Sequence, residues 1–323
     1  MAPVPPPPSG SRRDQPSGAG QRPSASARAH SRAPARRRRR FGPLTVLILS
    51  FLITVLVAVL ALSLRGRIIA LGDGATATPE AAGPAPVFPD MTGYTASRII
   101  DDEVFYESEA MSEEEIAAFI AEVNEGCVPG RDGTPCLADA VFETQTREVS
   151  DTCPGGYIAA GGQSAARIIS RVASACGINP RVLLVLIQKE QGLLTASGSR
   201  LTAHDYEAAT GYACPDGGQC DPAFAGFFAQ LYGAAGQFQR YRLDPGGYAF
   251  VAGTPTTIAY SPDGSCGSGE VTAANQATAG LYNYTPYLTN DAAASGGDDC
   301  TTWGNWNFYG YYRAFFGSPL VTG

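Results

Sequence analysis

Apolar residues recur at spacings of three and four in six stretches of the chain after residue 110, which is the period of a helix with one buried face. These stretches cover residues 112–123, 163–175, 179–192, 224–241, 273–282 and 305–317. Residues 124–155 are rich in Gly, Pro and Cys and are expected to be irregular, and residues 244–270 predict a loop or a short β-hairpin. The pattern therefore predicts a mainly α fold with few strands.

Two of these stretches carry clear signals for where a helix begins. Ser112 and Glu115 have the spacing of a capping box, in which each side chain bonds to the backbone of the other residue. Asn179 is a good N-cap, and Pro180 suits the first helical position, where a missing N–H has no cost. Gly192 is a plausible stop for the second helix.

Glu190 falls on the apolar face of the helix predicted over 179–192. Burial on that face would raise the pKa of its carboxyl group, which is what a general acid working near neutral pH requires. Alternatively, Glu190 lies at the helix end in solvent and pairs with Arg181 or Arg200. Periodicity alone leaves both interpretations open.

Residues 44–64 form an apolar run of 21 residues without a charge. As a helix this run would be about 30 Å long, enough to span a bilayer. It is longer than the core of a cleaved signal peptide, so a retained anchor is favoured. Five arginines at 36–40 precede the run and only Arg65 and Arg67 follow it, which predicts a cytoplasmic N-terminus and an extracellular remainder. Residues 1–43 are rich in Pro and Arg and predict a disordered cytoplasmic tail.

The formal net charge of −7 hides a strong asymmetry between the two sides of this run. Residues 1–67 hold twelve arginines and one acid, which leaves 11 basic and 29 acidic residues after them, a charge of −18. Such a surface argues against nucleic acid as a partner. Residues 65–90 are expected to form an extended stalk between the membrane and the folded part.

All eight cysteines lie after position 120, on the predicted extracellular side. An even number of cysteines in that setting predicts disulfides, and the simplest pairing joins each cysteine to the next one along the chain. The expected pairs are Cys127–Cys136, Cys153–Cys176, Cys214–Cys220 and Cys266–Cys300, one of 105 possible connectivities. Only one histidine, His204, lies outside the tail, so neither a metal site nor a cofactor is expected.

Two other clusters are expected to be structural rather than functional. The acidic run at 101–103 could suggest cation binding but is more typical of a solvated surface. The aromatic residues of the last stretch have helical spacing, which is typical of a core more often than of a sugar platform. They are Trp303, Trp306, Tyr309, Tyr312 and Phe316.

The chemistry available to this chain is narrow. There is no Gly-x-Ser-x-Gly nucleophile elbow and no Gly-rich phosphate loop, so hydrolases of those kinds are set aside. What remains is one carboxylate on an apolar helix, with aromatic and amide side chains in loops, a composition typical of sites that cleave sugars. Asp205, Asp216 and Asp221 are candidates for a second carboxylate.

The segment from Asn179 to Gln191 resembles the catalytic-glutamate helix of the lysozyme-like superfamily, especially lytic transglycosylases of the soluble and goose-type kinds. More broadly, residues 97–317 look like a family of exported actinobacterial hemagglutinin-like proteins. The segments that carry this wider resemblance are Met111…Glu115-Ile116…Phe119, Lys189-Glu190-Gln191-Gly192-Leu193, Thr210-Gly211-Tyr212…Cys214-Pro215, Asn283-Tyr284-Thr285-Pro286-Tyr287 and Gly304-Asn305…Asn307-Phe308-Tyr309.

The resemblance implies a disulfide-stabilised α+β domain of the lysozyme-like kind over residues 156–323, with residues 91–155 as an N-terminal extension. Glu190 would be the general acid that protonates the glycosidic oxygen of peptidoglycan and then acts as base, with an anhydro sugar as the transglycosylase product. Tyr282, Asn283 and Tyr284 are similar to a segment that those enzymes place across the cleft, and Tyr212 is a candidate for stacking on substrate.

This sequence departs from the pattern of those enzymes at three places. Gln191 stands where a serine is expected, residues 210–212 keep only the glycine of the Gly-Leu-Met-Gln loop, and Thr285-Pro286 replaces a glycine. A non-catalytic, glycan-binding adhesin that keeps the lysozyme-like shell is therefore the alternative, and a structural envelope protein without a ligand is a third.

Overall fold

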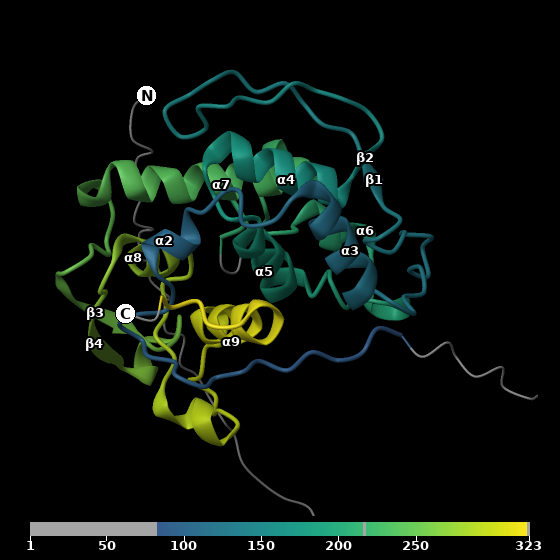
Figure 1. Cartoon of the computed structure of the whole chain (residues 1–323). Coiled ribbons are helices and arrows are strands. Elements are labelled where there is room, and N and C mark those ends of the chain that lie inside the picture. Colours follow the sequence, from purple (N-terminus) through teal and green to yellow (C-terminus); the bar gives the residue numbers. More distant parts are fainter. Residues whose placement is uncertain (1–82, 216–217, 322–323) are drawn as a thin grey trace, which may run out of the picture. The chain divides into compact units, whose positions relative to one another are not determined.

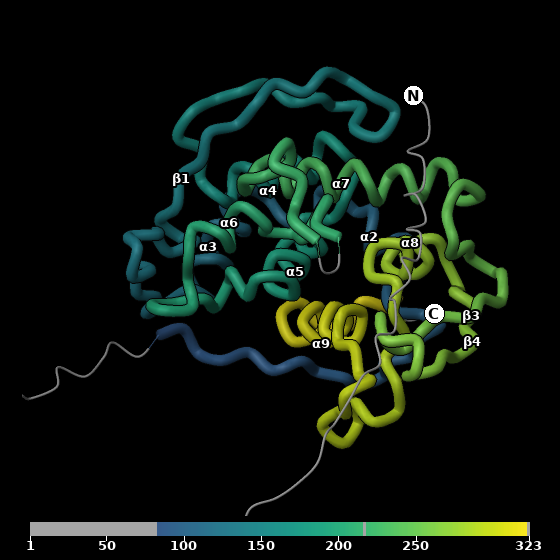
Figure 2. Tube along the Cα trace, turned by 180° about the vertical axis from the view of Figure 1, so that it is seen from behind, coloured from purple at the N-terminus to yellow at the C-terminus, as the bar shows by residue number. Residues whose placement is uncertain are grey.

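The helix Pro180–Gln191 (α5) lies in the middle of the fold, with α4 (Ala165–Cys176) on one side and α9 (Gly304–Phe316) on the other (Figures 1 and 2). The computed structural model describes residues 83–321 except 216–217. Every residue of α5 from 182 to 187 has no exposed surface, in keeping with the unbroken apolar sequence of that part of the helix.

The other helices surround this central helix. Contacts join α4 to α3 and α7, and α7 in turn to α6 and α8. The bounds of these helices are Asp102–Phe105 (α2), Glu113–Val123 (α3), Ala203–Glu207 (α6), Phe227–Leu243 (α7) and Gln276–Tyr284 (α8). Short 3₁₀ turns cover Gly198–Arg200, Pro222–Phe224, Pro245–Gly247, Gly264–Cys266 and Asp291–Ser295. The described chain is therefore mainly helical, as predicted.

Strands are few and short. Val141–Phe142 (β1) pairs with Gln163–Ser164 (β2), and Pro255–Ala259 (β3) pairs antiparallel with Ser268–Thr272 (β4). The second pair is the hairpin expected within 244–270, although β4 extends two residues beyond that range. Between β1 and β2 the chain forms a long irregular arm that lies across α4 and α7 in both views (Figures 1 and 2).

The predicted helix signals are confirmed. Ser112 and Glu115 form the capping box at the start of α3. The Asn179 side chain accepts a hydrogen bond from the Arg181 N–H, Pro180 is the first helical residue, and Gly192 ends α5 in the left-handed conformation. These boundaries are set by residues close in sequence, which is why they can be identified without tertiary information.

All four predicted disulfides are present. The eight cysteines are bonded in four pairs of sequence neighbours, with no free cysteine among the described residues. The bonds join Cys127 to Cys136, Cys153 to Cys176, Cys214 to Cys220 and Cys266 to Cys300.

Residues 89–101, which we call the N-terminal strap, run along α9 and end beside α8 (Figure 1). The Asp90 N–H donates to the Gly310 carbonyl at 3.0 Å, and the Asp90 carboxylate pairs with Arg313 at 2.9 Å. A Cβ on Gly310 would lie 2.3 Å from the Cβ of Pro89, so the close approach of strap and helix requires glycine there. The strap therefore belongs to the core of the fold rather than to a tail.

The expectation of a solvated acidic run at 101–103 is wrong for its first two members. Asp101 is only 3% exposed, and its carboxylate accepts hydrogen bonds from the Arg98 side chain, the Asn275 amide and the Val321 N–H. The Asp102 carboxylate accepts from the N–H of Ala277 in the first turn of α8. Partners about 175 and 220 positions away, absent from any local pattern, hold these acids inside the protein.

The predicted tail at 1–43, the predicted span at 44–64 and most of the predicted stalk lie outside the described residues. Within residues 83–215 and 218–321, no helix combines the length and apolar character needed to cross a bilayer. Residues 91–155 and 156–323 fall in the same compact unit.

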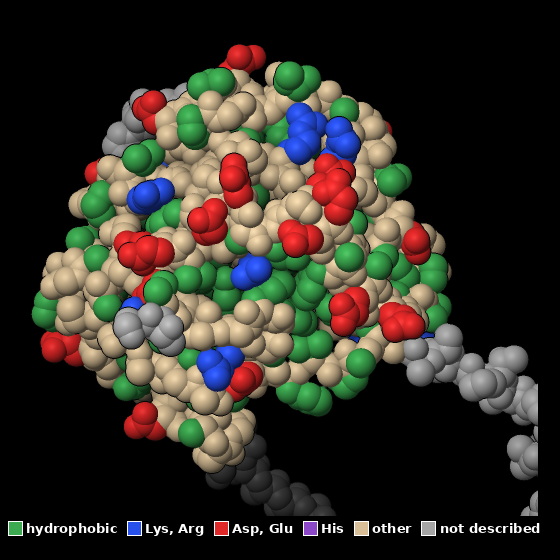
Figure 3. Space-filling model, in the orientation of Figure 1, with side chains coloured by type: hydrophobic (Ala, Val, Ile, Leu, Met, Phe, Trp, Pro, Cys, Tyr) green, Lys and Arg blue, Asp and Glu red, His purple; other side chains and the backbone are tan. Residues whose placement is uncertain are grey.

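The face seen in Figure 3 has acidic side chains scattered over it, with hydrophobic side chains gathered near its middle. Few basic side chains appear between them. This agrees with the acidic balance counted from the sequence after residue 67.

Candidate functional site

Glu190 lies in the last turn of α5, just before Gly192 turns the chain away in a left-handed conformation. Its side chain is 25% exposed, so it is neither sealed in the core nor free at a frayed end. The carboxylate pairs with Lys189, a partner that neither interpretation of the sequence had named. Arg181 instead bonds to the Ala110 carbonyl.

Lys189 is the buried member of this pair. Its side chain is 4% exposed, and its ammonium contacts Glu190 Oε1 and also donates to Thr285 Oγ1 at 3.1 Å. Lysine is almost never buried unless it is paired, because removing an isolated ammonium from water is very costly. Lys189 therefore binds the end of α5 to the segment after α8 and holds the Glu190 carboxylate in place.

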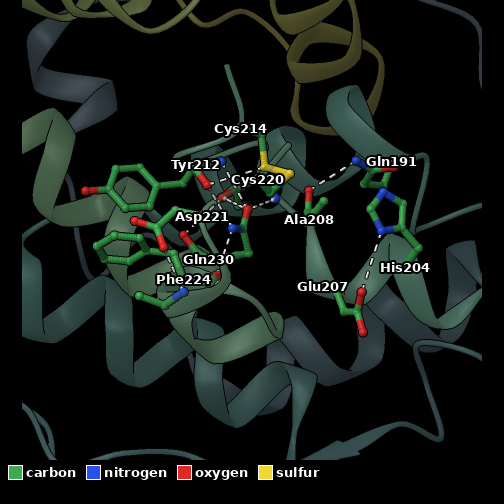
Figure 4. Close-up of a disulfide and its surroundings, with 12 residues drawn as sticks. Gln191, His204, Glu207, Ala208, Tyr212, Cys214, Cys220, Asp221, Phe224 and Gln230 are labelled. Carbon is green, nitrogen blue, oxygen red and sulfur yellow. Dashed lines mark hydrogen bonds and ion pairs between the residues drawn. A yellow bond between two sulfur atoms is a disulfide. The ribbon is translucent and has the colours of Figure 1, made fainter. Parts of the chain in front are cut away.

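The loop 208–212 passes beside the Glu190 carboxylate and is held by side chains from three helices. Gln191 of α5 donates to the Ala208 carbonyl at 3.1 Å, and the Tyr284 hydroxyl of α8 donates to the Thr210 carbonyl at 2.7 Å. Gln230 of α7 is fully buried and accepts from the N–H groups of Thr210 and Tyr212. Figure 4 shows Gln191 reaching Ala208 and Gln230 pointing into the turn around Tyr212.

Gly211 brings this loop against the carboxylate. A Cβ on Gly211 would lie 3.2 Å from Glu190 Oε2, and the residue has φ of +68°, where side chains are disfavoured. The two carboxylate oxygens thus have different neighbours: Oε1 contacts Lys189, and Oε2 lies next to Gly211. Each carboxylate oxygen has a distinct environment.

Two cavities meet at this loop. The first, of about 530 Å³, is lined by the Lys189–Glu190 pair and by residues of the segments 284–287 and 302–304. The second, of about 550 Å³, is lined by Tyr212, Gln237 and Tyr241 among others. Gly211, Cys214 and Tyr284 line both, so the two cavities are adjacent. We call the first the Glu190 cavity and the second the Tyr212 cavity.

Tyr284 separates the two cavities and is strongly constrained. Its hydroxyl is enclosed and donates to Thr210, and its ring stacks on Phe238 at 4.8 Å between centroids. Burial, and secondarily the negative charge of Glu190, raises the pKa of Tyr284 well above its ordinary value. The phenol is therefore a neutral hydrogen-bond donor, and Tyr284 lines the same cavity as Glu190.

Tyr212 lies flat on α7. A Cβ on Gly233 would be 2.3 Å from its ring, the ring packs edge-on against Phe224 at 5.0 Å, and its hydroxyl accepts a hydrogen bond from Arg240 at 2.9 Å. Tyr212 lines the Tyr212 cavity but not the Glu190 cavity. The structure thus places it in the groove next to Glu190, with its orientation fixed by α7.

Tyr282 and Asn283, the other candidates for substrate binding, line neither cavity. Tyr282 is 1% exposed and donates its hydroxyl to the Ala96 carbonyl of the N-terminal strap at 2.9 Å. The Asn283 amide bonds to both the N–H and the carbonyl of Phe250. Their contacts join α8 to its neighbours, because successive helical residues point in different directions and only Tyr284 reaches the groove.

Of the candidates for a second carboxylate, Asp221 lines the Tyr212 cavity, and neither Asp205 nor Asp221 lines the Glu190 cavity. Asp205 accepts hydrogen bonds from Thr202 at the start of α6, and Asp221 caps the turn Pro222–Phe224 through the Ala223 N–H. Asp216 lies outside the described residues. Among the described residues that line the Glu190 cavity, Glu190 is the only acid. No cluster of His, Cys, Asp or Glu suited to a metal ion occurs in the described part of the chain.

Sequence reasoning missed Lys189, Gln230 and Trp303. A signal for Gln230 was available, since it lies on the apolar face of α7 together with Phe227 and Leu231, where an amide must find buried partners. Trp303 was grouped with core aromatic residues, yet it is 37% exposed and lines the Glu190 cavity. Tyr309 and Tyr312 of the same group are buried, as expected.

The chain has no match among protein-family models, curated proteins or solved structures.

Proposed function

We propose that this protein is a membrane-anchored enzyme that cleaves the glycan strands of peptidoglycan, with Glu190 as its general acid and base. The observation that carries the proposal is the placement of Glu190. Its partly exposed carboxylate lines an open cavity together with aromatic and hydroxyl side chains, and no second acid lines that cavity among the described residues.

Among the described residues that line the Glu190 cavity there is no second acid, and Asp221 lines the adjacent Tyr212 cavity instead. A Glu190 cavity with one acid favours one class of glycan cleavage. Glycosidases that hydrolyse their substrate use two carboxyl groups, about 5–10 Å apart, to activate water or to form a covalent intermediate. A lytic transglycosylase needs one, because the substrate's own hydroxyl attacks the anomeric carbon. We therefore favour transglycosylase chemistry, with an anhydro sugar as the product.

The reaction would proceed at Glu190 Oε2, the oxygen that faces away from Lys189. The Glu190 carboxylate first takes up a proton from solvent. The carboxyl group then gives that proton to the glycosidic oxygen, and the bond from that oxygen to the anomeric carbon breaks. The carboxylate that results is stabilised by the Lys189 ammonium. It then takes the proton of the attacking sugar hydroxyl as the new bond to the anomeric carbon forms, which restores the carboxyl group.

The proposed function includes a cellular location for the domain. Residues 44–64 would anchor the chain in the membrane with residues 1–43 in the cytoplasm, and the domain would face the cell wall outside. Four disulfides are in keeping with an oxidising compartment.

A second candidate function is non-catalytic binding of cell-wall glycan, as in an adhesin. The observation that favours it is the ion pair itself, because a carboxylate already bound to an ammonium can serve structure alone. In that case the groove would bind glycan without cleaving it.

The test is to incubate purified full-length protein in detergent with intact sacculi and to analyse the soluble products by mass spectrometry. Glu190→Gln is compared with wild type and with Glu270→Gln, the same change at an exposed acid on β4. We expect anhydro-muropeptides from wild type and Glu270→Gln and none from Glu190→Gln. Equal product from Glu190→Gln would exclude Glu190 as the acid. Saturable binding without product from wild type would favour the adhesin.

A further inference from the structure

Trp303 is the one large aromatic side chain in the described lining of the Glu190 cavity that is substantially exposed, at 37%. It stands at the N-cap of α9, directly before the helix begins at Gly304. An exposed indole in a concave site costs free energy unless a ligand covers it, since its apolar faces remain in contact with water. A ligand with an apolar face would remove this surface from water.

The indole is rigidly placed. A Cβ on Gly297 would lie only 2.6 Å from its Cζ2, so the chain at Gly297 presses against the ring. The ring of Trp306 also packs against it edge-on, with centroids 6.3 Å apart. A ring held in this way loses little conformational entropy when a ligand stacks on it.

The loop that carries Trp303 is held in place by covalent and polar contacts. Cys300 is bonded to Cys266, which ties the loop to the β3–β4 hairpin region. The Thr301 hydroxyl donates to Asn290 Oδ1 at 2.7 Å, and the Asn290 amide donates to Asp298 at 2.8 Å. These bonds fix the loop whose last two residues, Thr302 and Trp303, line the cavity.

The charges of the cavity limit what the ligand can be. Lys189 and Glu190 neutralise each other, and the only other titratable side chains in the described lining are a histidine, His204, and tyrosines. An aromatic face, hydroxyl side chains such as Thr285 and Thr302, and a lining without net charge suit the apolar ring face and hydroxyl groups of a neutral sugar.

We propose that Trp303 forms a sugar subsite of this groove, in which a β-linked hexopyranose unit stacks its C–H face on the indole while the adjoining glycosidic bond lies at Glu190. The proposal rests on the proposed function, because it takes the substrate to be a glycan. It adds the residue that binds the sugar and the side of the cavity, towards α9, on which that sugar lies.

The chain offers a direct readout of this subsite. It contains only two tryptophans, Trp303 and Trp306, so Trp306→Phe leaves Trp303 as the sole indole. The full-length Trp306→Phe protein also carrying Glu190→Gln, which removes the proposed acid, is titrated with the β-1,4-linked tetramer of N-acetylglucosamine. We expect a saturable change in tryptophan fluorescence.

Affinity is then measured by calorimetry in the Glu190→Gln background. We expect Trp303→Ala to weaken binding of the tetramer by about tenfold or more and Trp303→Phe to restore much of the loss, since loss of ring contact is sufficient for such a change. Phe88→Ala, a change at an aromatic side chain that is 77% exposed and lines neither cavity, should bind as the parent does.

The outcomes separate the subsite from the proposed function. Absence of tetramer binding, binding without a fluorescence change, or unchanged affinity in Trp303→Ala overturns the subsite. If wild type cleaves sacculi and Trp303→Ala does so with unchanged KM, the proposed enzymatic function is supported and the proposed subsite is refuted. If wild type cleaves nothing but tetramer binding depends on Trp303, the proposed subsite is supported and the proposed enzymatic function is refuted.

Discussion

Replacing Asp101 by Asn should destabilise the fold more than its place in an acidic run suggests. Asp101 is 3% exposed, and its two oxygens accept from the Arg98 side chain, the Asn275 amide and the Val321 N–H, the last at 2.7 Å. An asparagine keeps one acceptor oxygen and turns the other into an NH₂ group, which then faces hydrogen-bond donors. One enclosed donor is left without a partner.

The size of the effect can be worked from these contacts. Arg98 is 46% exposed, so its pair with Asp101 is screened by water and is left out of the sum. Losing a charge-assisted bond to an enclosed donor and leaving that donor unsatisfied costs about 2–3 kcal/mol. The midpoint of thermal unfolding should then fall by roughly 4–12 °C for a domain of this size.

The assay is urea unfolding of the oxidised full-length protein, followed by circular dichroism. Glu103→Gln is the matched control, because it removes a charge from the same run at an exposed position and should change the free energy of unfolding by less than about 0.5 kcal/mol. If Asp101→Asn is as stable as Glu103→Gln, the described bonds of Asp101 do not support the fold and the reasoning is refuted.

Three further predictions concern other parts of the molecule. Glu190→Ala should cost about 2–4 kcal/mol of stability by leaving the Lys189 ammonium buried without its partner, and Lys189→Met added to it should recover part of that loss in a double-mutant cycle of urea unfolding. Gly310→Ala should cost about 1–3 kcal/mol, because its methyl group meets the N-terminal strap, and thermal unfolding should show a lower midpoint. Burial raises the pKa of Tyr94 and of Tyr241 to about 12, so stability should be lost between about pH 10 and 12 in alkaline unfolding followed by tyrosinate absorbance.

Each of these three has a result that would contradict it. Additive losses in the Lys189 and Glu190 variants would mean that the two side chains do not interact. A Gly310→Ala protein as stable as Gly246→Ala, whose methyl group would meet open space, would deny the close contact with the strap. Above about pH 10 the unfolded chain releases the protons of these tyrosines while the folded chain keeps them, so the free energy of unfolding should fall as the pH rises. Unchanged stability up to about pH 12 would contradict this prediction.

The features that sequence reasoning identified correctly are those decided by nearby residues. The caps of α3 and α5 use side chains two or three positions from their partners, and the shortest disulfide joins cysteines six positions apart. Local spacing carries enough information for such features because the chain between the partners has few conformations.

The features that it missed depend on distant partners. Lys189 binds Thr285, 96 positions away, and Asp101 binds Asn275 and Val321. A single sequence shows a lysine or an aspartate at such a position and implies solvent, because these residues are usually exposed. Within the candidate site, Glu190 was identified from its helix, but which of Tyr282, Asn283 and Tyr284 faces it depended on how α8 is rotated. That rotation is set by packing against α2 and α7, which the local pattern does not contain.

The strap and the disulfides have opposite places in the order of synthesis. The strap is made before every described helix and strand, yet the partners of Asp90, Thr92 and Asp101 lie more than 200 positions later, so it cannot dock until α9 and the residues after it exist. Contacts of such long range slow folding. The cysteines follow the reverse rule, since the second member of each pair bonds to the cysteine that emerged just before it. Oxidation of each pair as it is completed therefore yields the native disulfides without reshuffling, whereas the strap docks only after its much later partners have been made.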